Sequence, residues 1–341
     1  MGLVRPCVPN GNRLTPIYIP DEATNRLMKP ALRHMLGGLV LALCLSAATV
    51  DAETIAIVTS DSLTSTRRTI SGARRVISDA HKDASFVEFS IASPGQEDEL
   101  AATIREAKPD LILTVGSRAT EFTQQYFSRT PIIFSAVLYP AISGFVETLA
   151  RPGRNITGAS LNVSAQTQFM YFREIVPDLK RIGVLYTENT APLIAPSKVL
   201  AEQEGLELVP IKISDETELP RALDSLVRSV DGIWSVADPR LFTPQATKFI
   251  LMRTLKSGVP LMGFSRHVVA SGALFALDFD YKAIGRQAGR IAAEVLDGTS
   301  PGSIRVTAPD VIWFHYNERT AKLLDVTVPD RLAAVAKEVY R

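Results

Sequence analysis

Short apolar runs alternate along this chain with longer stretches of helical periodicity. Residues 110–117 read DLILTVGS, a nearly continuous apolar run that ends at a Gly-Ser pair. Such a run predicts a strand buried on both faces, as in a parallel sheet. Residues 231–238, DGIWSVAD, form a second run of similar length that ends in small and polar residues. Because ligands bind beyond the carboxyl ends of strands in open α/β sheets, these two strand ends are the first candidates for a binding site.

The segments around these two strands recur in the same order. TIAIVTSDS at residues 54–62 and RIGVLYTEN at residues 181–189 open the two copies, and each copy later has a strand that begins with proline. The offset between the copies is 121 residues from Asp110 to Asp231 and 129 residues from Pro131 to Pro260. The repeat predicts an α/β fold with two Rossmann-like lobes, each built on a parallel sheet.

The last third of the chain has the clearest helical pattern. Apolar residues recur at helical spacing over residues 281–296, and Gly298 follows at the position where glycine commonly ends a helix. VIWFHY at residues 311–316 predicts one more strand. Residues 331–340 predict a terminal helix.

The N-terminal segment has the features of an export signal. Residues 35–50 form a mostly apolar run of 16 residues, with Lys29 and Arg33 before it and Val50-Asp51-Ala52 after it. A basic flank, a short apolar core and small residues at the end are typical of a secretory signal peptide. We therefore expect export to the periplasm and cleavage after Ala52.

Two alternatives for this segment stay open. Lipid attachment at Cys44 would make a lipoprotein, although the bulky Leu43 directly before it is unusual for that signal, and an uncleaved anchor is the other alternative. Met28 would begin a signal of ordinary length. The cysteines, Cys7 and Cys44, both precede the expected cleavage site, so the remaining chain depends on its apolar cores rather than on disulfides.

The charge balance argues against a nucleic-acid partner. The 341 residues include 37 Lys and Arg against 36 Asp and Glu, and 46% of the chain is hydrophobic. No basic stripe and no helix-turn-helix pattern occurs. These features indicate a globular protein.

Catalytic and cofactor motifs are missing from the sequence. His81, His267 and His315 are far apart, and the spacings of zinc sites, phosphate-binding loops and dinucleotide-binding loops do not occur. Residues 263–267 resemble a nucleophile elbow, but His267 stands where that motif needs a second glycine. We therefore predict a binding protein that is not an enzyme and has no metal or cofactor.

The candidate ligand-binding residues follow the predicted strand ends. Aromatic side chains with a few hydroxyls, carboxylates and backbone N–H groups are typical of a small-molecule pocket. In the first lobe these residues are Ser60, Asp61, Gly116, Ser117, Val137 and Tyr139. In the second lobe they are Tyr186, Asn189, Asp238, Phe264, Ser265 and Asp278.

Roles follow from the chemistry of these side chains. Gly116 and Ser117 begin a helix and would donate to an anionic group, although Ser117 can equally be a helix cap. Asp238 and Asp278 would accept hydrogen bonds from the other end of the ligand, although a capping role before the helix at residue 281 is an alternative for the Asp278–Asp280 pair. Two aromatic residues would provide apolar walls, Tyr186 and Phe264.

Several segments resemble one known family. They read PIIFSAVLYP, RPGRNITGASLNV, PDLKRIGVLYTEN, VPLMGFSRHVVASGALFALDFDYKAIGRQAGRIAAEVLDG and NERTAKLLDVTVP. With them the chain resembles the ABC-transporter substrate-binding proteins of periplasmic-binding type I fold, in the branch related to tryptophan- and tyrosine-type binding proteins. The long segment from residue 259 is the most specific. Tyr139 is a departure, because relatives often have Asp before this proline, so the family's usual ligand does not follow.

The resemblance implies a small solute that binds between two lobes, closure about a three-strand hinge and delivery to a membrane permease. It implies discontinuous lobes, which we place at residues 53–162 plus 277–300 and at residues 163–276 plus 301–341, after an extension of residues 1–52. We expect a monomer that binds an amino acid or another small carboxylate. The main alternative is a periplasmic binding protein that signals to a membrane sensor kinase. A periplasmic enzyme and a transcription regulator of the same fold are weaker alternatives.

Overall fold

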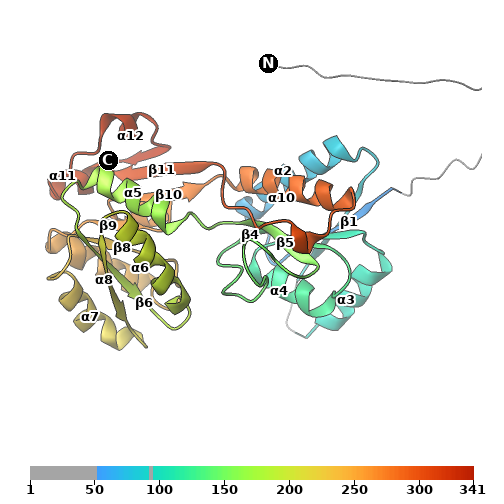
Figure 1. The fold of residues 1–341 in the computed structure, drawn as a ribbon, viewed down its shortest axis with the longest axis horizontal. Helices are drawn as coiled ribbons and strands as arrows, with labels where there is room; N and C mark the ends of the chain where they lie inside the picture. The colour runs from blue at the N-terminus through green and yellow to red at the C-terminus, as the bar shows by residue number, and fades with distance from the viewer. Residues whose placement is uncertain (1–51, 92–94) are drawn as a thin grey trace, which may run out of the picture. The chain divides into compact units, whose positions relative to one another are not determined.

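The computed structural model describes residues 52–91 and 95–341, drawn as a coloured ribbon in Figure 1. Three hypotheses about the N-terminal segment fall outside these residues: the signal peptide that ends at Ala52, the lipid on Cys44 and the start at Met28. Within the described ranges, no helix has the length and apolar character that crossing a membrane requires.

The first sheet consists of parallel strands in the order β2-β1-β3-β4-β5. Its strands are β1 (Thr54–Thr59), β2 (Ser85–Ser90), β3 (Leu111–Val115), β4 (Ile132–Val137) and β5 (Ile156–Ser160). Every residue of β3 is buried, which confirms the prediction of a strand covered on both faces. Parallel pairing places Thr59, Val115 and Ser135 side by side near the carboxyl ends of β1, β3 and β4.

Helices cover both faces of this sheet. They are α2 (Thr64–Ala80), α3 (Glu97–Glu106), α4 (Ser117–Tyr126) and α10 (Tyr281–Leu296). One apolar cluster joins the sheet to α2 and α10, and another joins it to α3 and α4. We call this sheet and these helices the first lobe. The return of α10, from near the end of the chain, puts it beside α2 (Figure 1).

Glycines allow α2 and α10 to touch through their backbones. A Cβ atom added at Gly285 would lie 2.0 Å from the carbonyl oxygen of Thr69, and one at Gly72 would lie 2.2 Å from that of Lys282. No side chain fits in either place, because real Cβ atoms do not approach backbone oxygens so closely. The two helices are therefore in direct backbone contact at these glycines.

The second sheet has the strand order β12-β11-β10-β9-β8-β6-β7. Its strands are β6 (Arg181–Tyr186), β7 (Glu207–Lys212), β8 (Gly232–Trp234), β9 (Leu261–Gly263), β10 (Phe275–Phe279), β11 (Ile312–Asn317) and β12 (Glu338–Tyr340). Its pairings are parallel except for the antiparallel pair β10–β11. Two mostly parallel α/β sheets confirm the predicted fold class.

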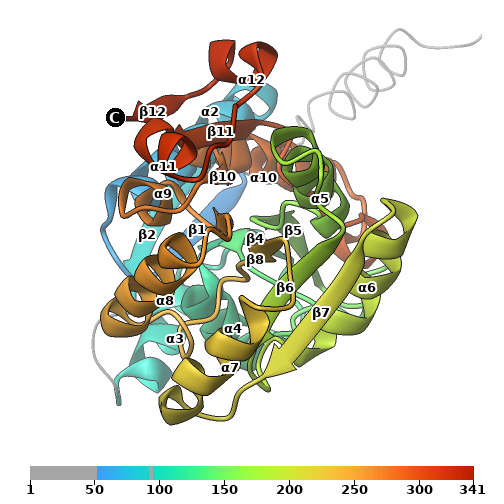
Figure 2. The ribbon, with the colours of Figure 1, turned by 90° about the vertical axis from the view of Figure 1, so that its left-hand side faces the viewer.

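Helices also cover both faces of the second sheet, which together with them is the second lobe. They are α5 (Ala165–Ile175), α6 (Ile194–Gln203), α7 (Leu219–Leu226), α8 (Pro244–Lys256), α9 (Arg266–Ala270), α11 (Glu318–Leu323) and α12 (Asp330–Ala334). Figure 2 shows α5 and α6 on one side of β6, with α7 and α8 on the other. The apolar clusters follow the same division. Short 3-10 turns lie at η1 (Ala191–Leu193), η2 (Glu216–Glu218) and, beside β5 of the first lobe, η3 (Pro301–Ser303).

The chain passes between the two sheets three times, as the family resemblance implied. The passages lie between β5 and α5, between β10 and α10, and between residue 307 and β11. Two of the predicted lobe boundaries were wrong by a few residues. Leu277–Phe279 belong to the second sheet, where they pair with β11. Residues 301–307 stay with the first, where the Thr307 N–H donates to the Gly158 carbonyl at 3.0 Å and Val306 enters the core.

The predicted terminal helix over residues 331–340 was also wrong. The helix α12 ends at Ala334, and Glu338–Tyr340 form β12, which pairs with β11 in parallel. Val339 packs against one apolar cluster of the second sheet and Tyr340 against the other. This alternation between faces has the period of a strand, and three residues are too few to reveal it in the sequence.

Candidate functional site

Ser60 and Asp61 directly follow β1 of the first lobe. Ser60 is half-buried and Asp61 is exposed. The Asp61 carboxylate accepts the Leu63 N–H at 3.0 Å and the Thr66 hydroxyl at 2.5 Å through the same oxygen. Asp61 thus closes the turn into α2, which leaves its second carboxylate oxygen outside these bonds.

Gly116 and Ser117 lie where β3 meets α4. Gly116 is the N-cap residue with a φ of +89°, a conformation that glycine adopts without strain. Its N–H donates to the Ser135 carbonyl at 2.9 Å, and its predicted role as a donor to a ligand stays a prediction. Ser117 is exposed and is the first helical residue rather than the cap. The N–H groups of the first turn from Ser117 onward have no acceptor within the helix.

Val137 and Tyr139 follow the same edge of the first sheet. The side chain of Val137 is fully buried in the core shared with α3 and α4, and its predicted place in the ligand site stays a prediction. Tyr139 is half-buried, with a φ of +49°, and its N–H donates to the Asn162 side-chain oxygen at 2.9 Å. Its ring packs against a core cluster of the second lobe.

The hydroxyl of Tyr139 also meets the second lobe. Burial raises the pKa of Tyr139, the nearby Asp238 carboxylate adds to the rise and the Ala237 backbone opposes it, which together bring the pKa to about 12. Because Tyr139 follows β4 of the first sheet and its ring packs on the second lobe, this side chain connects the two lobes.

Asp238 is the most tightly held of the predicted residues. Its side chain is 2% exposed, and one carboxylate oxygen accepts the hydroxyls of Thr187 at 2.6 Å and Thr190 at 2.9 Å. The other oxygen accepts the Arg240 N–H at 3.0 Å. Asp238 therefore ties the β6 end to the β8 end, and its predicted role as a ligand acceptor stays a prediction.

The remaining predicted residues of the second lobe flank this network. Tyr186 is half-buried at the end of β6, and the exposed Asn189 donates its N–H to the Thr187 hydroxyl at 3.2 Å. Phe264 packs edge-on against Phe242 with ring centres 4.9 Å apart. Ser265 occupies the N-cap position of α9 without a side-chain cap bond.

Asp278 lies at the end of β10 and is 9% exposed. Its two carboxylate oxygens accept the backbone N–H groups of Phe279 at 2.8 Å and Arg266 at 3.3 Å. The alternative of a capping role is confirmed for Asp280 instead, which accepts the Lys282 N–H at 2.9 Å. Asp278 thus orders the turn into α9, and its predicted role as a ligand acceptor stays a prediction.

Charges from both lobes surround Tyr281 at the start of α10. Burial raises the pKa of Tyr281, the carboxylates of Asp278 and Asp61 raise it further, and the Arg266 guanidinium lowers it. Asp61 belongs to the first lobe, whereas Asp278 and Arg266 belong to the second. Predicted residues of both lobes therefore act on one phenol at the crossing from β10 to α10.

Sequence analysis missed the residues that hold the predicted ones in place. Thr187 and Thr190 bind Asp238, and Asn162 binds the Tyr139 backbone. Two threonines three residues apart after a predicted strand were the sequence signal that could have identified Thr187 and Thr190. No local pattern identifies Asn162, because its partner lies 23 residues earlier.

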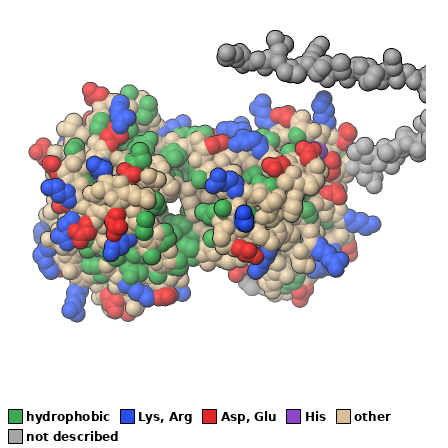
Figure 3. Space-filling model, viewed as in Figure 1, with side chains coloured by type: hydrophobic (Ala, Val, Ile, Leu, Met, Phe, Trp, Pro, Cys, Tyr) green, Lys and Arg blue, Asp and Glu red, His purple; other side chains and the backbone are tan. Residues whose placement is uncertain are grey.

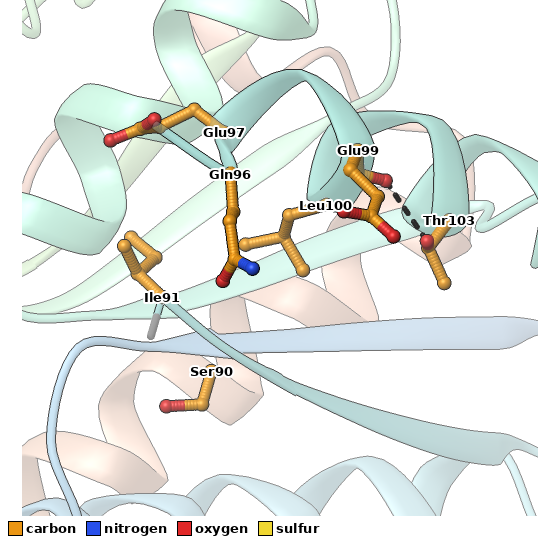
Figure 4. Close-up of a pocket in the computed structure, with 7 residues that line it drawn as sticks. All are labelled: Ser90, Ile91, Gln96, Glu97, Glu99, Leu100 and Thr103. Atoms are coloured by element: carbon orange, nitrogen blue, oxygen red, sulfur yellow. Dashed lines mark hydrogen bonds between the residues drawn. The ribbon is translucent and has the colours of Figure 1, made fainter. Parts of the chain in front are cut away.

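A small hollow of about 230 Å³ lies apart from these residues, between the end of β2 and the start of α3 (Figure 4). Its lining is Ser90, Ile91, Gln96, Glu97, Glu99, Leu100 and Thr103. In Figure 4 the Thr103 hydroxyl is bound to the Glu99 carbonyl, at 2.9 Å, within the helix. None of the predicted site residues lines this hollow.

Charge is mixed over the surface. On the face seen in Figure 3, side chains of both signs are interspersed over the two lobes. In the part of the chain that the structure describes, no group of three or more His, Cys, Asp or Glu residues is placed to hold a metal ion.

Comparison with known proteins identifies the family. The family model described as ABC transporter substrate binding protein matches residues 52–340. The chain belongs to this family. A tyrosine-binding protein of Clostridioides difficile (strain R20291) is 30% identical over 232 residues, which is 67% of this chain and 66% of that relative. The chain thus spans just under two thirds of that curated relative.

Solved structures agree with the fold of a substrate-binding protein. A ligand-free, open substrate-binding protein with adhesive properties from Clostridium difficile has a TM-score of 0.71 at 21% identity, and the match covers 85% of this chain and 99% of that one. A Streptococcus pneumoniae domain in complex with L-Trp has a TM-score of 0.61 at 21% identity, over 85% and 100% of the two chains. At such identities the likeness concerns the fold.

Proposed function

We propose that this substrate-binding protein captures an amino acid or another small carboxylate between its two lobes. Family membership over residues 52–340 is the observation that carries the proposal. A relative that binds tyrosine and a structural neighbour with bound L-Trp support an amino acid as the class of solute. Closure about the three chain crossings would bring both lobes onto the solute, and the solute would favour the closed state through contacts with both.

The start of α4 is the proposed site for the solute carboxylate. Ser117 is exposed there, and the first turn of α4 contains no acidic residue. By contrast, the first turn of α3 carries Glu97, Asp98 and Glu99. Free N–H groups and the helix dipole favour an anion at such an end, and the acidic residues of α3 already supply one there. The start of α4 is thus open to a carboxylate from outside the chain.

A matched pair of variants at Ser117 tests this site. Ser117→Asp places a fixed carboxylate at the start of α4, where it competes with the solute and is compatible with the helix dipole. Ser117→Asn has nearly the same shape without the charge. Isothermal titration calorimetry with amino acids and small carboxylates should show at least tenfold weaker binding for Ser117→Asp than for Ser117→Asn. Equal affinities of the two variants would reject the site, and no binding by the unaltered protein would reject the solute class.

Delivery to a membrane permease is the proposed role of the bound solute. Deleting the gene should abolish uptake of the radiolabelled solute by cells while the solute's metabolism inside the cell is unaffected. If the protein instead reports to a sensor kinase, uptake would persist and the transcriptional response to the solute would disappear. We also propose export with cleavage after Ala52, which N-terminal sequencing of the secreted protein checks.

A further inference from the structure

Tyr139 has an unusual backbone for its residue type. Its φ is +49°, and Ala136, three residues earlier, has a φ of +57° where the β4–β5 register breaks between Ser135 and Val137. Non-glycine residues with positive φ are uncommon and cost free energy, so surrounding structure must maintain them. For Tyr139 that support includes the Asn162 side chain, whose oxygen accepts its N–H at 2.9 Å.

This backbone sends the Tyr139 side chain from the first lobe to the second. The ring packs against the cluster of the second lobe that contains Trp234 and Val236. The phenol lies near the backbone of Ala237 and the Asp238 carboxylate, both of which act on its pKa. The cluster thus supplies the apolar wall against which an aromatic ring packs.

The contact lies where the fold is expected to bind ligands. Tyr139 follows β4 of the first sheet, and Ala237 follows β8 of the second. Both positions are beyond the carboxyl ends of parallel strands, the edge at which open α/β sheets bind their ligands. Burial raises the pKa of Tyr139 to about 12, so at neutral pH its hydroxyl is a neutral, protonated group.

We propose that Tyr139 occupies the place of an aromatic ligand group on the second lobe and thereby excludes aromatic amino acids from the site. This inference rests on the proposed function and narrows the solute to a small, non-aromatic carboxylate. A solute with a phenol or indole ring would have to displace the Tyr139 ring from this cluster.

Removing the ring tests the exclusion. Tyr139→Gly suits the positive φ, and Tyr139→Asn is a second variant that also tolerates this backbone. Tyr139→Phe, the matched control, keeps the ring. Calorimetry with p-cresol and L-tyrosine should show that the Gly and Asn variants bind both compounds at least tenfold more tightly than the unaltered protein does. Tyr139→Phe should show no such gain.

The possible outcomes separate the two proposals. Binding of p-cresol without any gain for L-tyrosine would mean that Tyr139 only fills a space between the lobes, and the specificity role would be overturned. If the unaltered protein bound L-tyrosine as tightly as the Gly and Asn variants do, the specificity role would also be overturned. The proposed function is tested separately, by binding of non-aromatic carboxylates to the unaltered protein. If non-aromatic carboxylates do not bind, the proposed function fails. The ratio of the L-tyrosine affinities of the variants and the unaltered protein still decides the role of Tyr139.

Discussion

The side-chain oxygen of Asn162 accepts the backbone N–H of Tyr139 at 2.9 Å. Asn162 lies on the first passage of the chain from β5 to α5, and Tyr139 follows β4. The bond therefore connects the hinge region to the residue whose ring reaches the second lobe. A conformational change in the segment between β5 and α5 would therefore move the Tyr139 ring through this bond.

Replacing Asn162 should loosen Tyr139. Asn162→Ala leaves the Tyr139 N–H without its acceptor, which should lower the free energy of unfolding by about 1 kcal/mol. Asn162→Asp keeps an acceptor at the same place and should lie closer to the unaltered protein. Urea denaturation of the three proteins measures the difference. If Asn162→Ala were as stable as the unaltered protein, the bond would contribute nothing to the placement of Tyr139.

Asp238 should behave as a structural residue. Asp238→Ala leaves the hydroxyls of Thr187 and Thr190 without their buried acceptor, and we expect a loss of about 1–3 kcal/mol in unfolding free energy. A double-mutant cycle with Thr187→Val should give a coupling of roughly 0.5–3 kcal/mol, since the two side chains are in contact.

A different pattern would contradict this role for Asp238. If it contacted the solute instead, its replacement would abolish binding in calorimetry while stability changed little. The coupling with Thr187 would then be near zero. Both measurements on the same protein samples decide between the two roles.

The glycine contact between α2 and α10 should not tolerate a methyl group. In Gly285→Ala the new Cβ would lie 2.0 Å from the Thr69 carbonyl oxygen, so the helices must move apart. We expect a loss of about 1–3 kcal/mol or more, in the range of overpacked cores. Glu294→Ala, at an exposed position of the same helix, should change stability by less than about 0.5 kcal/mol. Equal effects of the two substitutions in urea denaturation would refute the close contact.

His315 should make the fold sensitive to acid. It is fully buried in β11, neither ring nitrogen has a hydrogen-bond partner, and its Nδ1 lies 3.6 Å from the Glu338 carboxylate. Burial lowers the pKa of His315. The Asp278 and Glu338 carboxylates oppose this decrease, while Arg266 and Lys337 add to it.

The sign of the effect follows from where the proton binds more readily. Because the pKa is lower in the folded state, the unfolded chain takes up the proton first as the pH falls below the unfolded value of about 6.5. Stability should therefore decrease from that pH downward, by at most about 1.4 kcal/mol per pH unit for this one group, until His315 is protonated in the folded state too.

Urea denaturation between pH 8 and pH 4.5 measures this dependence. The stability of His315→Gln should lack the contribution of His315 to the pH dependence. At pH 8 the difference in stability between this variant and the unaltered protein gives the cost of altered packing. The difference between the two proteins should then shrink as the pH falls below about 6.5. A constant difference over the whole range would show that His315 does not change its protonation on unfolding.

Local patterns in the sequence determined most of the secondary structure and the kind of fold. Apolar runs such as residues 111–115 must be buried on both faces whatever surrounds them, so they predict parallel strands at once. The helix at residues 281–296 follows from its periodicity, since its apolar stripe needs a partner. The repeat of these elements also predicted two similar lobes.

The tertiary structure alone decided which sheet the crossing segments join and which polar groups are free. Leu277–Phe279 and residues 301–307 are short, and their pairing depends on strands far away in the sequence. Asp238, Asp278 and Gly116 looked available to a ligand, yet each is already bonded within the protein. A hydrogen bond is satisfied by whichever partner lies within about 3 Å, and that distance is set by packing between elements rather than by local sequence. Tyr139 shows the same limit, since only the folded chain brings its ring to the core cluster of the second lobe.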